Sequence, residues 1–366
     1  MESGAAGLSL SRLIVVAASC LIASASAMAM AVAQQAGISA AAVAAAAARP
    51  RPAVEAILDA FAEYNVVALG EGPHGNEAGH RFRVSLIRHP RFPATVNDIV
   101  VEFGTARHQA VMDRYLAGEN VPRKSLRRAW QDTTVPGPTW DRPIYAQFFA
   151  EVRALNATLP AERKIRVWLG DAPIDWDAVR GPADVHKFGV AKDGHDGELV
   201  KREVLAKGRK ALIIFGDGHL QGRGFAPGSL TNVLERPPDA VKIFAIAATT
   251  AVATVDPKVK DWRVPSLARV RGTTLGRQPY ARFYQLPPAP GWSKVTLEDQ
   301  FDAVLYLGPP STDHHVQFPV ELCDDAAYMQ MRYHRLALAG GPVGTTTADT
   351  LKRVCAIHAE TSRPQK

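Results

Sequence analysis

The sequence predicts an α/β fold, in which a mostly parallel sheet carries helices on both faces. Several apolar runs lack polar–apolar alternation, as strands covered on both sides require. Segments with helical spacing lie between several of these runs, and such alternation of strands and helices is typical of parallel sheets. With 366 residues, 47% of them hydrophobic, the chain can bury one sizeable core. We therefore predict a single α/β domain over residues 53–366.

The N-terminal part is expected to lie outside this domain. An arginine precedes an apolar run at 13–22, and small residues follow it, which is typical of a signal peptide over residues 1–33. The run is shorter than the roughly 20 apolar residues of a spanning helix, and we predict no transmembrane segment. An Ala- and Pro-rich linker at 34–52 comes next. The protein is thus expected to be periplasmic or secreted, with a lipid anchor at Cys20 as the alternative.

The domain is expected to open with an amphipathic helix, because apolar residues recur at helical spacing from 54 to 61. An entirely apolar strand follows at 66–69. A helix over 76–88 ends before a proline, and the next strand lies at 99–104. Strand, helix and strand in this order indicate one parallel unit.

The same alternation continues toward the C-terminus. Further strands are predicted at 165–171, 211–217, 241–248 and 303–308, and further helices at 106–117, 143–155 and 197–207. The segments 181–196 and 263–292 show no clear period, so we interpret them as loop insertions.

Polar residues gather where the predicted strands end. Glu71 and His74 lie in the motif GEGPHG, Glu102 interrupts an apolar strand, and His219 ends the motif GDGH after the fourth predicted strand. Ligands of parallel sheets bind beyond the carboxyl ends of the strands, so we expect these four side chains to share one site. The structural alternatives are a helix cap for Glu71, an ion pair with Arg107 or another base for Glu102, and an ordinary structural histidine for His219.

Other polar residues near the predicted strand ends have a weaker case. They are Asp171, Asp217, His80 and the pair His314 and His315. Arg107 is the base best placed by sequence to stabilise negative charge. A denser basic patch, made of Arg123, Lys124, Arg127 and Arg128, is typical of a solvated face.

Several classes of protein lose support. The sequence has no Gly-x-Ser-x-Gly elbow, no phosphate-binding loop and no His-Glu-x-x-His motif. The net charge is +7, but acids and bases are interspersed, so nucleic acid is not implied as a partner. Cys323 and Cys355 would pair in an oxidising compartment, and two buried free thiols are the equal alternative.

The motifs ALGEGPHG at 68–75, VEF at 101–103 and GDGH at 216–219 resemble the erythromycin esterase, ChaN-like and Tiki superfamily in order and spacing. The resemblance covers about 54–307. It implies an α/β fold with its site at the strand ends. Glu71 and His74 match the first motif, Glu102 matches the strand acid, and His219 matches the second motif.

The resemblance implies three activities: ester hydrolysis with His- and carboxylate-activated water, metal-dependent proteolysis, and haem binding. We expect a hydrolase acting on an ester or amide bond of a small-molecule or peptide substrate. His74 would be the general base, supported by Glu71 or Glu102, and His219 would assist the leaving group or oxyanion. In the metal-assisted version Glu71, His74, Glu102 and His219 would bind Zn, Mn or Fe. The alternative is a ChaN-like protein that binds haem or another large ligand without catalysis.

Overall fold

The computed structural model describes residues 46–361, with gaps at 224–227, 285–293 and 342–346. Residues 47–366 form one compact unit. The predicted signal peptide and most of the predicted linker lie outside the described residues. Among the helices described, none is long and apolar enough to cross a membrane.

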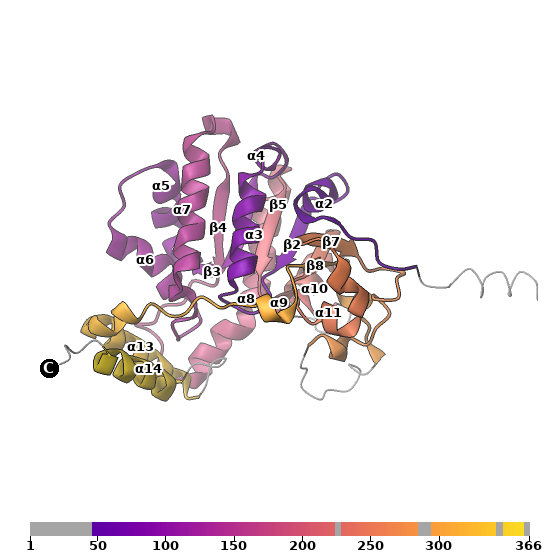
Figure 1. The fold of residues 1–366 in the computed structure, drawn as a ribbon. Coiled ribbons are helices and arrows are strands. Elements are labelled where there is room, and N and C mark those ends of the chain that lie inside the picture. Colours follow the sequence, from indigo (N-terminus) through magenta and orange to yellow (C-terminus); the bar gives the residue numbers. More distant parts are fainter. Residues whose placement is uncertain (1–45, 224–227, 285–293, 342–346, 362–366) are drawn as a thin grey trace, which may run out of the picture. The chain divides into compact units, whose positions relative to one another are not determined.

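An eight-stranded sheet forms the centre of this unit (Figure 1). Its strands are β1 (Arg51–Pro52), β2 (Val66–Gly70), β3 (Asp98–Thr105), β4 (Arg166–Asp171), β5 (Ala211–Phe215), β6 (Ile243–Ala247), β7 (Ser266–Arg269) and β8 (Ala303–Tyr306). They lie in the order β1-β7-β8-β6-β2-β5-β3-β4. Neighbours from β8 through β4 pair in parallel, and β7 pairs antiparallel with β1 and β8. The predicted mostly parallel sheet is confirmed.

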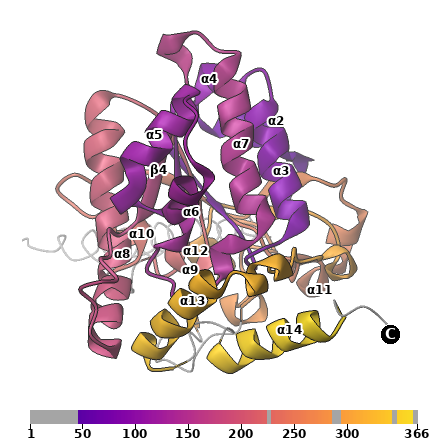
Figure 2. The same cartoon turned by 90° about the vertical axis from the view of Figure 1, so that its left-hand side faces the viewer.

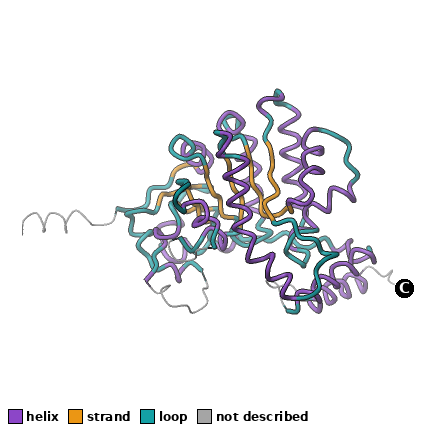
Figure 3. Tube along the Cα trace, turned by 180° about the vertical axis from the view of Figure 1, so that it is seen from behind, coloured by secondary structure: helices purple, strands orange, loops and turns teal. Residues whose placement is uncertain are grey.

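Helices cover the sheet on both sides (Figure 3). They are α2 (Ala53–Ala60), α3 (Glu77–Arg88), α4 (Phe92–Thr95), α5 (Gln109–Ala117), α6 (Arg123–Gln131), α7 (Pro143–Ala157), α8 (Pro182–Glu203), α9 (Asp217–Leu220), α10 (Leu230–Glu235), α11 (Val252–Val255), α12 (Leu297–Gln300), α13 (Ala326–Ala339) and α14 (Ala348–Thr361). Short 3-10 turns include η1 (Ala106–His108) and η9 (Val320–Asp324).

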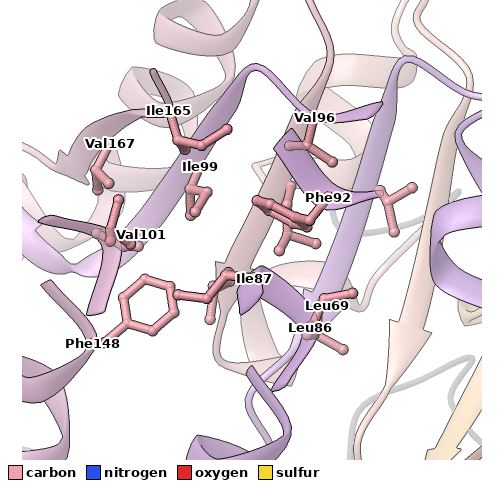
Figure 4. Close-up of a cluster of buried hydrophobic side chains, with 14 of the residues drawn as sticks. Leu69, Leu86, Ile87, Phe92, Val96, Ile99, Val101, Phe148, Ile165 and Val167 are labelled. Carbon is pink, nitrogen blue, oxygen red and sulfur yellow. The ribbon is translucent and has the colours of Figure 1, made fainter. Parts of the chain in front are cut away.

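Two apolar cores explain why the strands lack alternation. Val67 and Leu69 of β2 belong to the core under α2, α3 and α7, part of which is drawn in Figure 4. Val66 and Ala68 point to the other core, under α8 and α10. Successive side chains of a strand face opposite sides of its sheet, and here both sides are covered. Every position of β2 is therefore buried.

The sequence predicted a loop at 181–196, and this prediction is wrong. The segment forms the first part of the 22-residue helix α8. Three glycines within this helix, Gly189, Gly194 and Gly197, weaken its helical signal in the sequence. Close packing explains the glycine at position 197, because a Cβ atom there would lie 2.3 Å from Val233 Cγ1 of α10. Tertiary contact thus overrides local propensity.

Two short strands also depart from the sequence-based prediction. Arg51 and Pro52 were assigned to the linker, but they form β1 at the edge of the sheet. The predicted loop 263–292 contains β7, which is only four residues long. Strands this short carry almost no periodic signal.

The C-terminal part adds α13 and α14, which lie side by side (Figure 2). Cys323 of η9 and Cys355 of α14 form a disulfide. This decides between the two states that the sequence left open for these cysteines. The bond ties α14 to the segment that precedes α13.

Candidate functional site

Three neighbouring strands bring the predicted site residues to one edge of the sheet. β5 lies between β2 and β3, and the three run parallel. Glu71 directly follows β2, Glu102 lies near the end of β3, and His219 lies in α9 just after β5. Because the carboxyl ends of parallel strands meet at one edge, these side chains approach one another.

Glu71 and His74 form the first of two histidine–carboxylate pairs. His74 Nδ1 lies 2.8 Å from Glu71 Oε2, and Arg83 Nη2 lies 3.2 Å from Glu71 Oε1. The side chain of Glu71 is 1% exposed, whereas that of His74 is 36% exposed. The His74 ring also packs edge-on against Trp140. A buried carboxylate therefore orients an imidazole that a substrate can reach.

Glu102 and His219 form the second pair. His219 Nε2 lies 3.1 Å from Glu102 Oε1, and His219 Nδ1 lies 2.5 Å from Asp193 Oδ1. Glu102 Oε2 accepts a hydrogen bond of 2.6 Å from the backbone N–H of Gly216. The register between β3 and β4 shifts after Val101, as at a β-bulge, and such irregularities redirect side chains near active sites.

The two pairs meet beside Gly216. A Cβ atom at this position would lie 3.1 Å from both His74 Cε1 and Glu102 Oε2, so a larger residue would press on both. One ligand atom from each of Glu71, His74 and Glu102 lies within 4.8 Å of the others. The structure thus places all four expected side chains together, while their chemical roles stay predictions.

The backbone of the GEGPHG turn is fixed by glycine and by buried partners. Gly72 and Gly75 have φ values of 67° and 86°, in the left-handed region that favours glycine. Asp217 Oδ1 accepts from the Gly72 N–H at 3.2 Å, and the Tyr145 hydroxyl accepts from the Gly75 N–H at 3.0 Å. This turn holds His74 at a defined position beside the sheet edge.

Lys192 of α8 is a site residue that sequence reasoning missed. Its Nζ lies 2.7 Å from Glu102 Oε1 and 3.7 Å from Asp171 Oδ1, and its side chain is only 5% exposed. The same helix supplies Asp193, the partner of His219. Both were hidden by the interpretation of 181–196 as a loop.

A signal for Lys192 was present in the sequence. Lys192, Asp196, Leu199 and Val200 are spaced at i, i+4, i+7 and i+8, which places them on one helix face. All four are buried. Extending the predicted helix at 197–207 toward the N-terminus would have placed a lysine and an aspartate on its apolar face.

Charge balance within the second pair fixes its protonation at neutral pH. Burial and the charge of Lys192 lower the pKa of His219, but Glu102 and Asp193 outweigh them and raise it to about 10. Burial disfavours the charged form of Glu102, yet Lys192 and His219 hold its pKa well below the usual value. At neutral pH both Glu102 and His219 therefore carry charge.

The first pair is more finely balanced. Burial lowers the pKa of His74, whereas the hydrogen bond and charge of Glu71 raise it, and the net shift is upward. Glu71 therefore favours the protonated state of His74, as a residue that supports a general base should.

Arg107 does not join the four side chains. In η1, its Nη1 lies 3.3 Å from Asp175 Oδ2, and these side chains are 39% and 44% exposed. The position after β3 suggested a charge-stabilising role, but the side chain turns toward a surface partner. Lys192 provides the cation beside Glu102 instead.

Asp171 and His80, two of the residues with a weaker case, are buried. Asp171 accepts hydrogen bonds of 2.6 Å from both the N–H and the hydroxyl of Thr134, and burial raises its pKa to about 6 despite Lys192. His80 is buried, and burial lowers its pKa to about 4.

The segment with the histidine pair crosses the GEGPHG turn. His315 Nδ1 lies 3.2 Å from the carbonyl oxygen of His74. The carbonyl oxygen of His314 accepts from the Glu77 N–H at 2.9 Å, while the His314 side chain is exposed. These contacts support the backbone of the turn and add no imidazole to the two pairs.

The donor set offers a divalent cation two carboxylates and one imidazole, from Glu71, His74 and Glu102. Imidazole and carboxylate together suit zinc, manganese or iron. His219, a predicted ligand, does not fit this set, because both of its ring nitrogens contact carboxylates. Each carboxylate of the set also has a cationic partner already, Arg83 or Lys192.

Comparison of the sequence with family models and with curated proteins finds no match. Solved structures with a similar fold include the type III effector HopBA1, which has 19% identity and a TM-score of 0.37 over 56% of this chain and 87% of that chain. They also include a mutant of the erythromycin esterase EreC in its open conformation, with 13% identity and a TM-score of 0.48 over 72% and 95% of the two chains. ChaN of Campylobacter jejuni, described with cofacial haem, has 14% identity and a TM-score of 0.36 over 53% and 85%.

The esterase and ChaN carry names of the superfamily that the sequence motifs resemble. These likenesses concern the fold alone and assign no role to any residue of this chain.

Proposed function

We propose that the protein is an exported hydrolase that cleaves an ester or amide bond with activated water. The observation that carries this proposal is the meeting of two histidine–carboxylate pairs beside Gly216, one with an accessible imidazole and one with a charged imidazole. A base and a positive charge on opposite sides of a reacting carbonyl are the two elements that hydrolysis by water needs.

In this mechanism His74 takes a proton from water through Nε2, because Nδ1 is engaged by Glu71. Glu71 orients the ring and stabilises the imidazolium that forms. The imidazolium then gives this proton to the leaving oxygen or nitrogen as the C–O or C–N bond breaks. His219 is protonated at neutral pH. Because Glu102 and Asp193 engage both of its ring nitrogens, it stabilises the oxyanion through its positive charge and not through a direct hydrogen bond. Lys192 keeps Glu102 charged, and Glu102 in turn holds His219.

Turnover of a panel of aryl esters, lactones and small amides by purified protein tests this proposal. His74→Ala should reduce kcat/KM by about 100-fold to 10,000-fold, the range typical of a lost general base. His186→Ala, an exposed histidine of α8, is the matched control and should keep full activity. Absence of turnover across the panel, or an unchanged rate in the His74 variant, would contradict the proposal.

The pH profile provides a second check. His74 works as a base only when neutral, and its pKa is raised above the ordinary value near 6.5, so activity should be lost as the pH falls through that raised pKa. Glu71→Gln removes the group that raises the pKa of His74. The acidic limb of kcat/KM should therefore move to lower pH in this variant, together with a lower maximum. An acidic limb at the same pH would argue against His74 as the base.

A metal-assisted hydrolase is the second candidate, because Glu71, His74 and Glu102 offer ligand atoms within 4.8 Å of one another. A bound metal would supply a more acidic water, while Arg83 and Lys192 would still balance the carboxylates. Elemental analysis of protein purified without chelator separates the candidates. About one equivalent of Zn, Mn or Fe that is lost in Glu102→Gln would favour the metal.

The alternative without catalysis is tested by haem titration of the same preparation. A Soret shift that saturates at one equivalent and disappears in His74→Ala, together with no turnover of any ester or amide, would favour a binding protein.

A further inference from the structure

A cavity of about 670 Å³ lies between α6, α7 and the turn η9. None of the four side chains of the two histidine–carboxylate pairs lines it. Its apolar wall includes Leu126 and Trp130 of α6, Ala146 of α7 and Leu322 of η9. A volume of several hundred Å³ with a mainly apolar wall is typical of small-molecule sites.

Two cations of the basic patch line this cavity, namely Arg123 and Arg127. Neither is in a salt bridge within the described part of the chain, whereas Arg128 of the same helix pairs with Asp132 at 2.9 Å. Arg127 lies over the ring of Tyr328, 5.8 Å from its centroid. Arg123, Lys124 and Arg128 are exposed, as the predicted solvated face requires, and Arg127 is partly buried. Arg123 and Arg127 in addition border an apolar cavity.

The acidic groups of the lining do not cancel this charge. Asp141 is engaged by Arg332 Nη2 at 2.6 Å and by the Tyr328 hydroxyl at 2.5 Å. Glu321 is exposed on the wall formed by η9. With Asp141 already neutralised, two arginines face one glutamate, and the lining keeps a net positive charge.

The start of α6 adds to the positive field. Its first turn has no acidic residue, and the Pro122 cap makes no side-chain hydrogen bond. The positive charges of Arg123 and Lys124 lie at the N-terminal end of α6, which is the positive end of the helix dipole, and the two repel each other. A negatively charged group held by Arg123 would relieve this repulsion. A neutral or cationic ligand would not relieve this repulsion.

We propose that this cavity binds an apolar carboxylate, such as a medium-chain fatty acid or an arylalkanoic acid. The carboxylate would pair with Arg123 and Arg127, whose guanidinium groups suit planar anions. The hydrocarbon part would lie against Leu126 and Trp130. This site goes beyond the proposed hydrolase, because it uses other residues and requires no chemistry.

Dodecanoate is a suitable probe. Calorimetry provides the readout, together with the change in tryptophan fluorescence that is lost in Trp130→Phe. We expect saturation at one equivalent with micromolar affinity. Dodecanol and dodecyltrimethylammonium have the same chain without the negative charge, and they should bind at least about tenfold more weakly, which corresponds to 1.4 kcal/mol. If dodecanol bound as tightly as dodecanoate, Arg123 and Arg127 would not be carboxylate ligands and the proposal would be overturned.

Paired variants locate the site. Ala146→Phe fills the cavity and should abolish binding, while Ala150→Phe, on an exposed face of the same helix, should leave it unchanged. Arg123→Gln with Arg127→Gln should weaken dodecanoate at least about tenfold, whereas Lys124→Gln, an exposed neighbour outside the lining, should not. No saturable binding below millimolar concentrations, or full binding by a correctly folded Ala146→Phe variant, would overturn the proposal.

Discussion

At the scale of single residues, Lys192 is the group on which the charge balance of the site depends. Its ammonium contacts Glu102 at 2.7 Å, and both side chains are at most 5% exposed. Removing one partner of such a pair leaves a buried charge, which typically costs about 3–5 kcal/mol. Lys192→Met should therefore lower the free energy of unfolding, measured by urea denaturation, by about that amount.

Two further variants make this test specific. Glu102→Leu combined with Lys192→Met removes both charges, so the double variant should be more stable than the sum of the single changes predicts. Lys187→Met changes an exposed lysine of the same helix and should shift the free energy of unfolding by less than about 0.5 kcal/mol. A Lys192→Met variant as stable as the Lys187 control would contradict the assigned role.

The sequence predicted those residues of the site that lie at the ends of strands, and it missed those that lie on a helix. Glu71, Glu102 and His219 lie at strand ends, and strand ends can be located from apolar runs alone. Lys192 and Asp193 reach the same place from helix α8, which contacts β4 and α10. Sequence spacing does not show where such a helix packs, and so their contacts became visible only in the structure.

At the scale of elements, two buried ion pairs attach α13 to the α/β layer. Arg332 Nη2 lies 2.6 Å from Asp141 Oδ2, and Arg335 Nη2 lies 2.6 Å from Asp132 Oδ1. Asp132 also contacts His108 at 2.8 Å. The helix was not predicted, because its basic residues on a buried face give it little amphipathic contrast.

Asp132 makes the attachment of α13 dependent on pH. Burial alone would raise the pKa of Asp132, but hydrogen bonds from His108 and Arg335 outweigh it and hold the pKa well below its usual value. A carboxyl group whose pKa is lowered by folding stabilises the fold above its unfolded pKa, about 3.9, and this stabilisation is lost as the pH falls further.

Asp132→Asn should accordingly reduce the free energy of unfolding at pH 7, and the difference from the unmodified protein should shrink below about pH 4. Urea denaturation across this range provides the measurement. Asp349→Asn, at an exposed position of α14, should show no such difference. A gap between Asp132→Asn and the unmodified protein that stays constant down to pH 2 would show that the ion pairs do not hold α13.

At the scale of the whole molecule, the fold class followed from the sequence because each central strand is buried on both faces. Residues of β2 alternate between two cores, so an uninterrupted apolar run was the expected pattern. The strands at the antiparallel edge of the sheet were harder to predict. β1 and β7 are short and lie at the antiparallel margin, where pairing partners rather than local sequence define a strand.

Different interactions hold the two C-terminal helices: ion pairs hold α13, and the disulfide holds α14. α13 has several buried residues and its two ion pairs, whereas Leu351 is the buried residue of α14 within the described chain. The bond between Cys323 and Cys355 closes a loop with a sequence separation of 32. In the chain-entropy model a loop of this size contributes about 3–4 kcal/mol. The stability of α14 should therefore depend on the bond far more than that of α13.

Reduction of the purified protein, or the double change Cys323→Ser and Cys355→Ser, should release α14 while the sheet and α13 stay folded. Hydrogen exchange should accelerate in α14 to the rate of an unstructured chain and change little in α13, because the contacts of Arg332 and Arg335 do not involve the cysteines. Oxidised protein without substitutions is the reference. Slow exchange retained throughout α14 after reduction would show that packing on Leu351 suffices. Equal acceleration in both helices would show that they unfold as one unit, with the disulfide holding the ion pairs as well.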